Sequence, residues 1–430
     1  MQMLKTIAVS LGALAATLSA PAAAQESGQT TIIHAESIIT DASAQPTGRA
    51  TITVRDGVIV SIEDGWSAVP EGAEMVHLEG KTVMPGLIDL HTHLTGDPGG
   101  DFWKEATEPD DWGVVVGAKN ARLTALAGFT TVREAGSAQH TAFSLRRGTE
   151  EGLIPGPRIV AAGPALAIVG GHGDVNGFRP EVNELLDTGY TCTGAVECAA
   201  KVRLASQNGA DIIKITATGG VLSQQGRGLE AHFTFDEMKS IADTAESLGL
   251  KVMAHAHGAR GIEMAAKAGI HTIEHGTYID KAAADAMREN GTILVPTLMA
   301  FQGITERLGQ GIYTPVVEEK VRAVADQAKV FMGNARDWGV TIAFGTDAGV
   351  FDHGRNAQEL GLMVAQGMSA REAVASATTG AARALGMENQ IGRVAPGYSA
   401  DIIAFEGNPL TDVRVLEDVD FVMVRGRVIE

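Results

Sequence analysis

Positive charge is scarce in this sequence. It holds 34 lysine and arginine residues against 52 aspartate and glutamate residues, a formal net charge of −18. Because phosphate binding needs a basic face, this balance argues against a nucleic-acid partner. It still permits an anionic small-molecule substrate, which needs only one local cation.

Cysteine is also scarce, with Cys192 and Cys198 the two residues present. Two cysteines do not make a zinc-ribbon site. A disulfide between them is permitted if the protein is exported, and two free or buried thiols are the equal alternative. Long polar or low-complexity tracts are lacking, so a folded chain is expected.

Long apolar runs are lacking except at the start of the chain. Residues 7–20 are apolar, follow Lys5 and precede the small-residue pattern that ends at Ala24. This arrangement predicts a signal peptide over residues 1–24 and export, to a bacterial periplasm. A buried helix or a membrane anchor is the alternative. With no second such run, we expect no membrane association after the signal is removed.

The two ends of the mature chain show β patterning. Residues 31–84 contain alternating runs around Asp56-Gly57, and residues 400–430 contain a similar turn at Arg425-Gly426. Both dipeptides indicate hairpins. We predict one small β domain that is built from both ends.

The middle of the chain alternates short apolar runs with helical stretches, several of which end in glycine, a common helix C-cap. Eight βα units predict a (β/α)8 TIM barrel. An open doubly wound sheet is the rival, which the count and the lack of a Gly-x-Gly-x-x-Gly fingerprint disfavour. The expected strands are residues 87–94, 129–136, 158–166, 211–220, 251–258, 271–279, 292–298 and 341–349.

Ionisable residues lie at or near the carboxyl ends of five of these strands, where barrel active sites form. They are His91, His93, Lys214, His255, His275 and Asp347. His91 and His93 are two apart on a strand, so both can face one metal ion. Asp347 could hold a metal ion and accept a proton from water.

Lys214 lies within an apolar strand, where an unpaired ammonium is costly. Burial lowers the pKa of a lysine and frees its nitrogen to react. A carbamate formed with carbon dioxide would offer two oxygens that can bridge two metal ions. A lysine paired with a nearby carboxylate is the alternative.

These motifs together resemble the amidohydrolase superfamily. The segments that carry the resemblance are PGLIDLHTH, IIKITATGG, AHAHG, IEHG and FGTDAG. The match is to the bimetal branch with a carboxylated lysine, which includes Xaa-Pro-type dipeptidases, carboxypeptidase-like enzymes and ochratoxin-hydrolysing amidohydrolases. Residues 83–89 and residues 391–410 resemble that family's junctions between the barrel and its β-sandwich. The implied division is a β-sandwich from residues 25–85 and 391–430, and a barrel over residues 86–390.

The resemblance implies a role for each ligand. His91, His93 and Asp347 would hold one divalent ion, His255 and His275 a second, and carboxylated Lys214 would bridge them. Asp347 would also act as general base toward a metal-bridging hydroxide. We choose His255 over His257 because it is the first histidine of AHAHG, and we assign no site role to His271. The ligand types suit zinc and other first-row ions. Homo-oligomers are common among such relatives.

Three further residues are candidates for substrate binding. His172 lies in GGHGD within a long loop, residues 167–194, and could donate a hydrogen bond to the scissile carbonyl oxygen. A loop histidine that bonds its own backbone is the equal alternative. Arg227, or else Arg133, could bind a substrate carboxylate, although a structural ion pair is the commoner fate of an arginine. His353 is a candidate for supporting the ligands.

The expected activity is metal-dependent hydrolysis of an amide bond that releases a C-terminal amino acid from dipeptides or N-acyl amino acids, ochratoxin-like aromatic amides included. Hydrolysis of cyclic amides or lactones at the same site is the alternative. A binding protein without catalysis is a third hypothesis, which the complete ligand set disfavours.

Overall fold

The computed structural model describes residues 29–99, 102–175, 177–224 and 228–430. The predicted signal peptide and Arg227 lie outside these residues. In the described part of the chain, no helix has the length and apolar character needed to cross a membrane.

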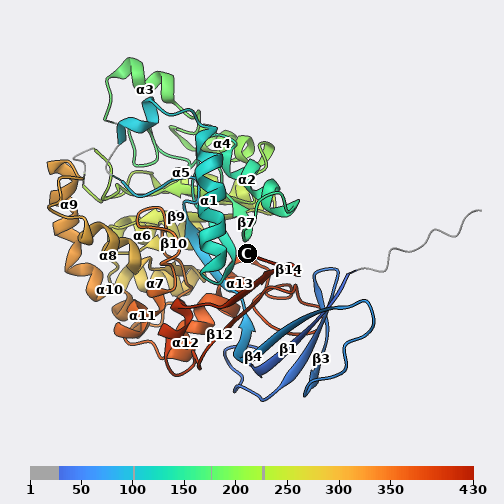
Figure 1. Ribbon diagram of the computed structural model, residues 1–430. Helices are drawn as coiled ribbons and strands as arrows, with labels where there is room; N and C mark the ends of the chain where they lie inside the picture. The colour runs from blue at the N-terminus through green and yellow to red at the C-terminus, as the bar shows by residue number, and fades with distance from the viewer. Residues whose placement is uncertain (1–28, 100–101, 176, 225–227) are drawn as a thin grey trace, which may run out of the picture.

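Both chain ends contribute strands to one seven-stranded sheet, whose blue strands lie at the lower right of Figure 1. The strand order is β14-β13-β12-β4-β1-β2-β3, with β1 parallel to β4 and all other neighbours antiparallel. Both ends therefore build one β unit, while its sandwich form stays a prediction. The strands are β1 (Thr30–Ile38), β2 (Ala50–Arg55), β3 (Val58–Asp64), β4 (Glu74–Pro85), β12 (Ile402–Phe405), β13 (Phe421–Val424) and β14 (Arg427–Val428).

The two predicted hairpin turns are confirmed. Asp56-Gly57 joins β2 to β3, with Arg55 paired to Val58, and Arg425-Gly426 joins β13 to β14. In each turn both central residues have positive φ, at 50° and 77° in the first and 49° and 76° in the second. Two consecutive positive φ values match the right-handed twist of the flanking strands.

Parallel strands form two further sheets, with orders β5-β6-β7 and β11-β10-β9-β8. Isolated parallel bridges link the segments between and beside these sheets, at Leu166 with Ile215, Leu294 with Ile342 and Thr92 with Ala348. The eighth expected strand is not regular, so the described strands form no closed ladder and the closed barrel stays a prediction. The bounds are β5 (Leu87–Thr92), β6 (Phe129–Glu134), β7 (Arg158–Ala161), β8 (Ile212–Thr216), β9 (Lys251–Ala256), β10 (Thr272–His275) and β11 (Ile293–Val295).

Helices follow the parallel strands along the chain and cover them in Figure 1, as the βα rhythm predicts. Gly269 and Gly291 end α6 and α7 in the left-handed conformation, which suits a residue without a side chain. The helices are α1 (Trp112–Leu126), α2 (Thr141–Glu150), α3 (Pro180–Leu186), α4 (Ala195–Gln207), α5 (Phe235–Ser247), α6 (Ala259–Ala268), α7 (Lys281–Asn290), α8 (Leu298–Glu306), α9 (Pro315–Ala325), α10 (Phe331–Asp337), α11 (Gln358–Ala365), α12 (Ala370–Ala375) and α13 (Ala381–Leu385), with short turns of other helix types at Phe102–Ala106, Gln327–Lys329, Ser376–Gly380 and Val413–Glu417.

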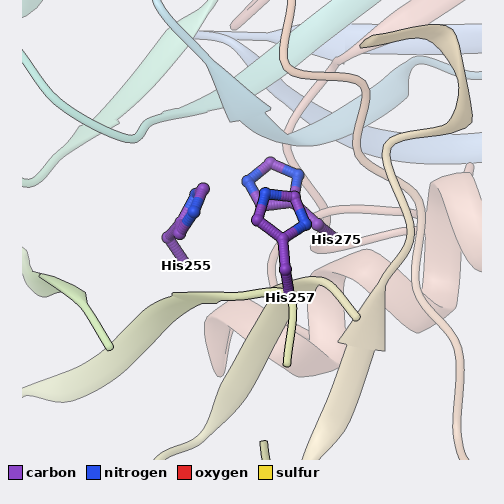
Figure 2. Close-up of side chains that lie close together, drawn as sticks. All are labelled: His255, His257 and His275. Atoms are coloured by element: carbon purple, nitrogen blue, oxygen red, sulfur yellow. The ribbon is translucent and has the colours of Figure 1, made fainter. Parts of the chain in front are cut away.

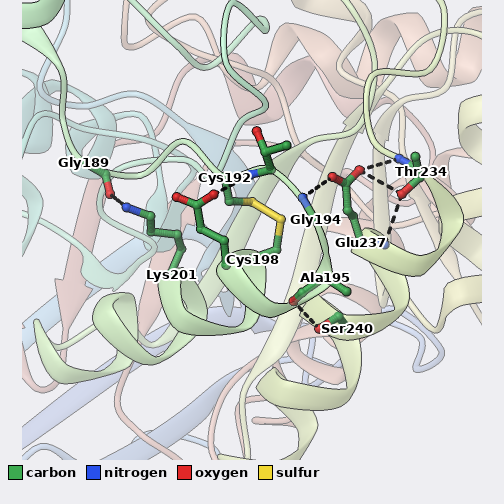
Figure 3. The surroundings of a disulfide bond; sticks show 11 residues. Gly189, Cys192, Gly194, Ala195, Cys198, Lys201, Thr234, Glu237 and Ser240 are labelled. Atoms are coloured by element: carbon green, nitrogen blue, oxygen red, sulfur yellow. Dashed lines mark hydrogen bonds between the residues drawn. A yellow bond between two sulfur atoms is a disulfide. The ribbon is translucent and has the colours of Figure 1, made fainter.

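The two cysteines form a disulfide at the start of α4 (Figure 3). Cys192 ends the long loop after β7, and Cys198 lies in the first turns of the helix. Around the bond, Gly194 N donates to Glu237 on α5, and Lys201 donates to the carbonyl of Gly189. The disulfide and these hydrogen bonds fix the far end of the loop that carries His172.

Replacing both cysteines with serine should lower stability, because the cross-link restricts the unfolded chain. The cysteines are six positions apart, and so short a loop implies a loss of about 2 kcal/mol. For a chain of 430 residues the loss lowers the melting temperature by roughly 2 to 3 °C, because the entropy of unfolding grows with chain length. Calorimetry checks this, with reduced parent protein as the control. A variant that melts with the oxidised parent would contradict the expectation.

Candidate metal centre

The predicted ligands meet at the carboxyl ends of the parallel strands. His91 lies on β5, Lys214 on β8, His255 on β9 and His275 at the end of β10, and Asp347 follows in the irregular eighth segment. All five side chains are buried. Two sets place their ligand atoms within 4.8 Å of one another, namely His91, His275 and Asp347, and His255, His257 and His275.

The hydrogen bonds of His91 and His93 define which ring nitrogen carries the lone pair. Nδ1 of His91 lies 2.9 Å from Glu274 Oε2, and Nδ1 of His93 lies 2.9 Å from the carbonyl oxygen of Gly136. Both partners can only accept, so each Nδ1 carries a hydrogen and donates it. In the neutral rings, Nε2 therefore presents a lone pair. These two Nε2 atoms lie 3.4 and 3.3 Å from Oδ1 of Asp347.

Three electron-rich atoms that face one another fit a divalent cation. Oδ1 of Asp347 is buried and accepts no hydrogen bond from a described residue. A proton can relieve part of the repulsion, since the Asp347 carboxylate raises the pKa of His93 above 6.5 although burial lowers it. A metal ion would satisfy all three atoms and displace that proton. The residues present therefore fit the metal that their pattern implies.

Lys214 lies within reach of the same centre. Its Nζ is 3.4 Å from Nε2 of His91, which is its hydrogen-bond partner among the described residues. Burial lowers its pKa to about 8. A salt bridge to a carboxylate, the alternative weighed for this lysine, is thus not the contact seen. The lowered pKa increases the fraction of uncharged amine available for carboxylation.

The second set consists of His255 on β9, His257 directly after β9 and His275 at the end of β10, and Figure 2 shows their rings close together. Nε2 of His255 donates to the carbonyl oxygen of Gly219 at 3.2 Å. In the neutral ring, Nδ1 therefore carries the lone pair that could bind a metal ion. Nδ1 of His275 is 2.7 Å from Thr297 Oγ1, and Nδ1 of His257 is 2.7 Å from Thr277 Oγ1. The geometry brings His257 as close as His255, so the choice of His255 stays a prediction.

The backbone at this centre is unusual. His275, Thr297 and Asp347 have φ values of 72°, 51° and 63°, a left-handed conformation that non-glycine residues rarely adopt. His275 and Asp347 are candidate ligands, and the third residue, Thr297, contacts the ring of His275 through its hydroxyl. Such conformations persist where the surrounding structure enforces them, and they concentrate at functional sites.

Arg133 lies away from the cavity, which disfavours its predicted role as a carboxylate ligand. Its side chain is fully buried and does not line the cavity. It donates to the carbonyl of Leu90 and forms an ion pair of 2.9 Å with Glu274. Because the buried guanidinium bonds residues of β5 and β10, its charge is paired with that of Glu274 and does not face the cavity.

Glu274 is a functional residue that the sequence analysis missed. One carboxylate oxygen bonds Arg133 and the other orients His91. A carboxylate that accepts from a ligating histidine holds the ring and raises its basicity. The available signal was an acidic residue inside an apolar strand, directly before His275. Glu134 is likewise an acidic residue at the end of a buried strand, and it accepts a hydrogen bond from the backbone N–H of Leu94. Burial raises its pKa to about 7.

Changing Glu274 to glutamine should weaken metal binding by about 10- to 100-fold, because His91 loses its anionic partner. Competition with a chelator measures the affinity. In Glu274→Gln the buried guanidinium of Arg133 also loses its partner, which could weaken metal binding by itself. The double variant Arg133→Met/Glu274→Gln removes that guanidinium and should still bind metal as weakly as the single variant. Glu237→Gln, which alters a helix cap outside the cavity, is the control. Parent-like affinity in Glu274→Gln would exclude this role.

The candidate ligands line a cavity of about 850 Å³. Buried apolar side chains from α8 and α9, among them Phe301, Ile304 and Val317, form part of its wall. His172 also lines it, as predicted for a substrate contact, with Nδ1 2.6 Å from Ser223 Oγ. Burial keeps the pKa of His172 well below 6.5. The ring is therefore neutral and able to donate one hydrogen.

Two other histidines lie outside the ligand set. His271 bonds the carbonyl of Ala384, in keeping with its assignment to no site role. His353, the candidate for ligand support, has Nε2 3.1 Å from the carbonyl of Gly96 and contacts the loop after β5. Within the described part of the chain, His353 forms no hydrogen bond with a candidate ligand.

Comparison with known proteins agrees with this geometry. The Amidohydrolase family model matches residues 82–429, most of the chain. The chain belongs to the amidohydrolase family. This amidohydrolase is therefore a hydrolase that acts on C–N bonds in small-molecule substrates, within a family that is typically metal-dependent.

Three relatives illustrate its neighbourhood. Ochratoxinase from Aspergillus niger is 31% identical to the amidohydrolase over 92% of this chain and 85% of its own. A solved Xaa-Pro dipeptidase with methionine bound in its active site has a TM-score of 0.87 at 37% identity, covering 94% of this chain and all of the other. A prolidase complexed with N-methylphosphonate-L-proline has a TM-score of 0.85 at 31% identity, with the same coverage. These fold neighbours are of the TIM-barrel type.

Proposed function

We propose that this amidohydrolase cleaves the amide bond of dipeptides or N-acyl amino acids and releases the C-terminal amino acid, with ochratoxin-like aromatic amides among its substrates. The names of the relatives, ochratoxinase and Xaa-Pro dipeptidase, support this class. We propose further that the chain forms a closed barrel with a terminal β-sandwich, is exported through residues 1–24 and assembles as a homo-oligomer.

The observation that carries the proposal is the placing of the donor set on one wall of a large cavity. His91 Nε2, His93 Nε2 and Asp347 Oδ1 face one another, and the cavity that they line has an apolar wall from α8 and α9. An amide can thus present its carbonyl to the ligand side and an apolar group to the wall. The volume of about 850 Å³ accommodates a dipeptide or an aromatic amide.

The residues of the chain have distinct tasks in this proposal. When bound, two divalent ions, with zinc as the expected element, would lower the pKa of a water molecule and polarise the scissile carbonyl. His91, His93 and Asp347 would hold one ion. His255 and His275 would hold the other, and carboxylated Lys214 would contribute an oxygen to each. Although burial alone would raise it, His91, His93 and Lys214 keep the pKa of Asp347 below 3.8. The ionised carboxylate takes the proton of the attacking water and passes it to the leaving amine.

His172 and Arg227 complete the proposed substrate site. The neutral ring of His172 would donate from Nε2 to the scissile carbonyl oxygen as negative charge develops there. With Arg133 disfavoured by its burial, Arg227 stays the proposed partner of the substrate carboxylate. It lies outside the described residues, three positions after Gln224, which lines the cavity.

A mass-spectrometric hydrolysis panel tests the proposal. Dipeptides and N-acyl amino acids varied at the C-terminal residue, together with lactones and cyclic amides, are offered to metal-loaded and chelator-stripped protein. We expect metal-dependent release of the free C-terminal amino acid. Cleavage of the cyclic substrates alone would favour the alternative, hydrolysis of cyclic amides or lactones. If no compound in the panel is hydrolysed, the proposal is overturned.

A further inference from the structure

The position of His172 is set by the segment that follows β8. Its Nδ1 lies 2.6 Å from Ser223 Oγ, and its ring centroid lies 4.2 Å from that of His255. The ring also lies directly against Gly220, where a Cβ atom would come within 2.3 Å of Nδ1. Gly220 thus leaves the space that the ring fills, and Ser223 supplies the polar contact.

The contact with Ser223 bears on which nitrogen of His172 carries the hydrogen. A hydroxyl can donate or accept, so both tautomers are open to the ring in principle. A histidine that donates from Nε2 to a carbonyl oxygen must have an unprotonated Nδ1, which then accepts from Ser223. The opposite arrangement would turn a lone pair toward the carbonyl oxygen and repel it.

The backbone around Ser223 is held from α9. Lys320 Nζ donates to the carbonyl oxygens of Gly220 at 2.8 Å and of Ser223 at 2.6 Å. Thr314, the residue before α9, donates to the side-chain oxygen of Gln224 at 2.9 Å. The helix that borders the apolar wall therefore also fixes the segment against which His172 lies.

We propose that Ser223 is a positioning residue whose hydroxyl donates to Nδ1 of His172, which keeps the hydrogen of the ring on Nε2 for the substrate carbonyl, and that Lys320 anchors Ser223. The inference rests on the proposed function, in which His172 is the carbonyl donor. Ser223 touches the ring and not the reacting atoms, so it acts through His172.

Ser223→Ala should lower kcat by about 10- to 100-fold, a large part of what one such donor provides, while KM and metal content stay near those of the parent. Ser223→Thr keeps the hydroxyl and should restore most of the rate. Lys320→Arg should retain more activity than Lys320→Met, because only the former can still donate to the two carbonyls. Ser240→Ala, which removes a hydroxyl bonded to Ala195 O, is the control and should not change the rate.

A double-mutant cycle separates the inference from the function on which it rests. If Ser223 acts through His172, adding Ser223→Ala to His172→Ala should change kcat by less than 2-fold. A further large loss would overturn the inference. If His172→Ala keeps full activity, His172 is not the carbonyl donor. If His172→Ala is slow but Ser223→Ala is fully active, the donor role of His172 stands and the positioning role of Ser223 is excluded.

Nitrogen-15 NMR of histidine-labelled, metal-loaded protein gives a readout that does not depend on turnover. The resonances absent from His172→Ala identify the ring. In the parent we expect the hydrogen on Nε2, and in Ser223→Ala a mixture of both tautomers. A hydrogen on Nδ1 in the parent would contradict the proposed direction of the hydrogen bond.

Discussion

Lys214→Ala should leave the protein folded but without measurable hydrolysis and with reduced metal content. The lysine lies beside the ligand set, buried on β8 and 3.4 Å from Nε2 of His91. If its carbamate bridges two ions, alanine removes one ligand from each. We expect activity below a hundredth of the parent value, since even the outer partners of metal ligands are worth about 10- to 100-fold.

A comparison of substitutions at Lys214 distinguishes a carbamate from a simple cation. Arginine keeps the positive charge but cannot be carboxylated, so Lys214→Arg should be as inactive as Lys214→Ala. Glutamate offers two oxygens and should retain more metal than either. Lys251→Ala on β9, which removes a lysine bonded to the carbonyl of Ala384, is the control. An active Lys214→Arg enzyme would exclude the bridging carbamate.

Metal analysis and carbon-13 NMR measure the effect directly. Parent protein loaded in labelled bicarbonate should show a carbamate resonance that is missing from Lys214→Arg. Because the resonance does not depend on turnover, it tests the modification even with an unsuitable substrate. A resonance that persists in the variant would assign the carbamate to another amine.

Asp347→Asn should lower kcat by at least about a hundred- to ten-thousand-fold, the range expected for loss of a proton-transfer group. The amide cannot accept the proton of the attacking water, although its oxygen can still face His91 and His93. We therefore expect a larger effect on kcat than on the melting temperature. Asp352→Asn, an exposed carboxylate five residues away that contacts Arg307, is the control. Parent-like turnover in Asp347→Asn would move proton transfer to another residue.

The sequence was most informative where local chemistry was unambiguous. The strand and helix rhythm, the two hairpin turns and the family could all be predicted from patterns along the chain. The candidate ligands could be named because polar residues at the ends of apolar strands are conspicuous, and parallel strands bring their carboxyl ends to one face. For Cys192 and Cys198 the spacing left two alternatives open, and the folded chain joins them.

Other features depend on contacts between segments that are far apart in the chain. Arg133 looked like a rim cation, because a strand end does not reveal which neighbour will bury the side chain. Its partner, Glu274, comes from a strand 141 residues later. The same holds for Ser223 and Lys320, which lie 97 residues apart and meet only in the folded chain.

The left-handed backbone of His275, Thr297 and Asp347 also arises from the tertiary structure, since even aspartate and histidine adopt it in a minority of cases and β-branched threonine hardly at all. The sequence by itself thus determined the family, the βα rhythm and the residues able to bind metal, because these follow from residue type and period. Only the tertiary structure decided which ring nitrogen each histidine leaves free, which charges are neutralised by burial and which face the cavity. Hydrogen bonds between distant strands set those properties, and no local pattern encodes such partners.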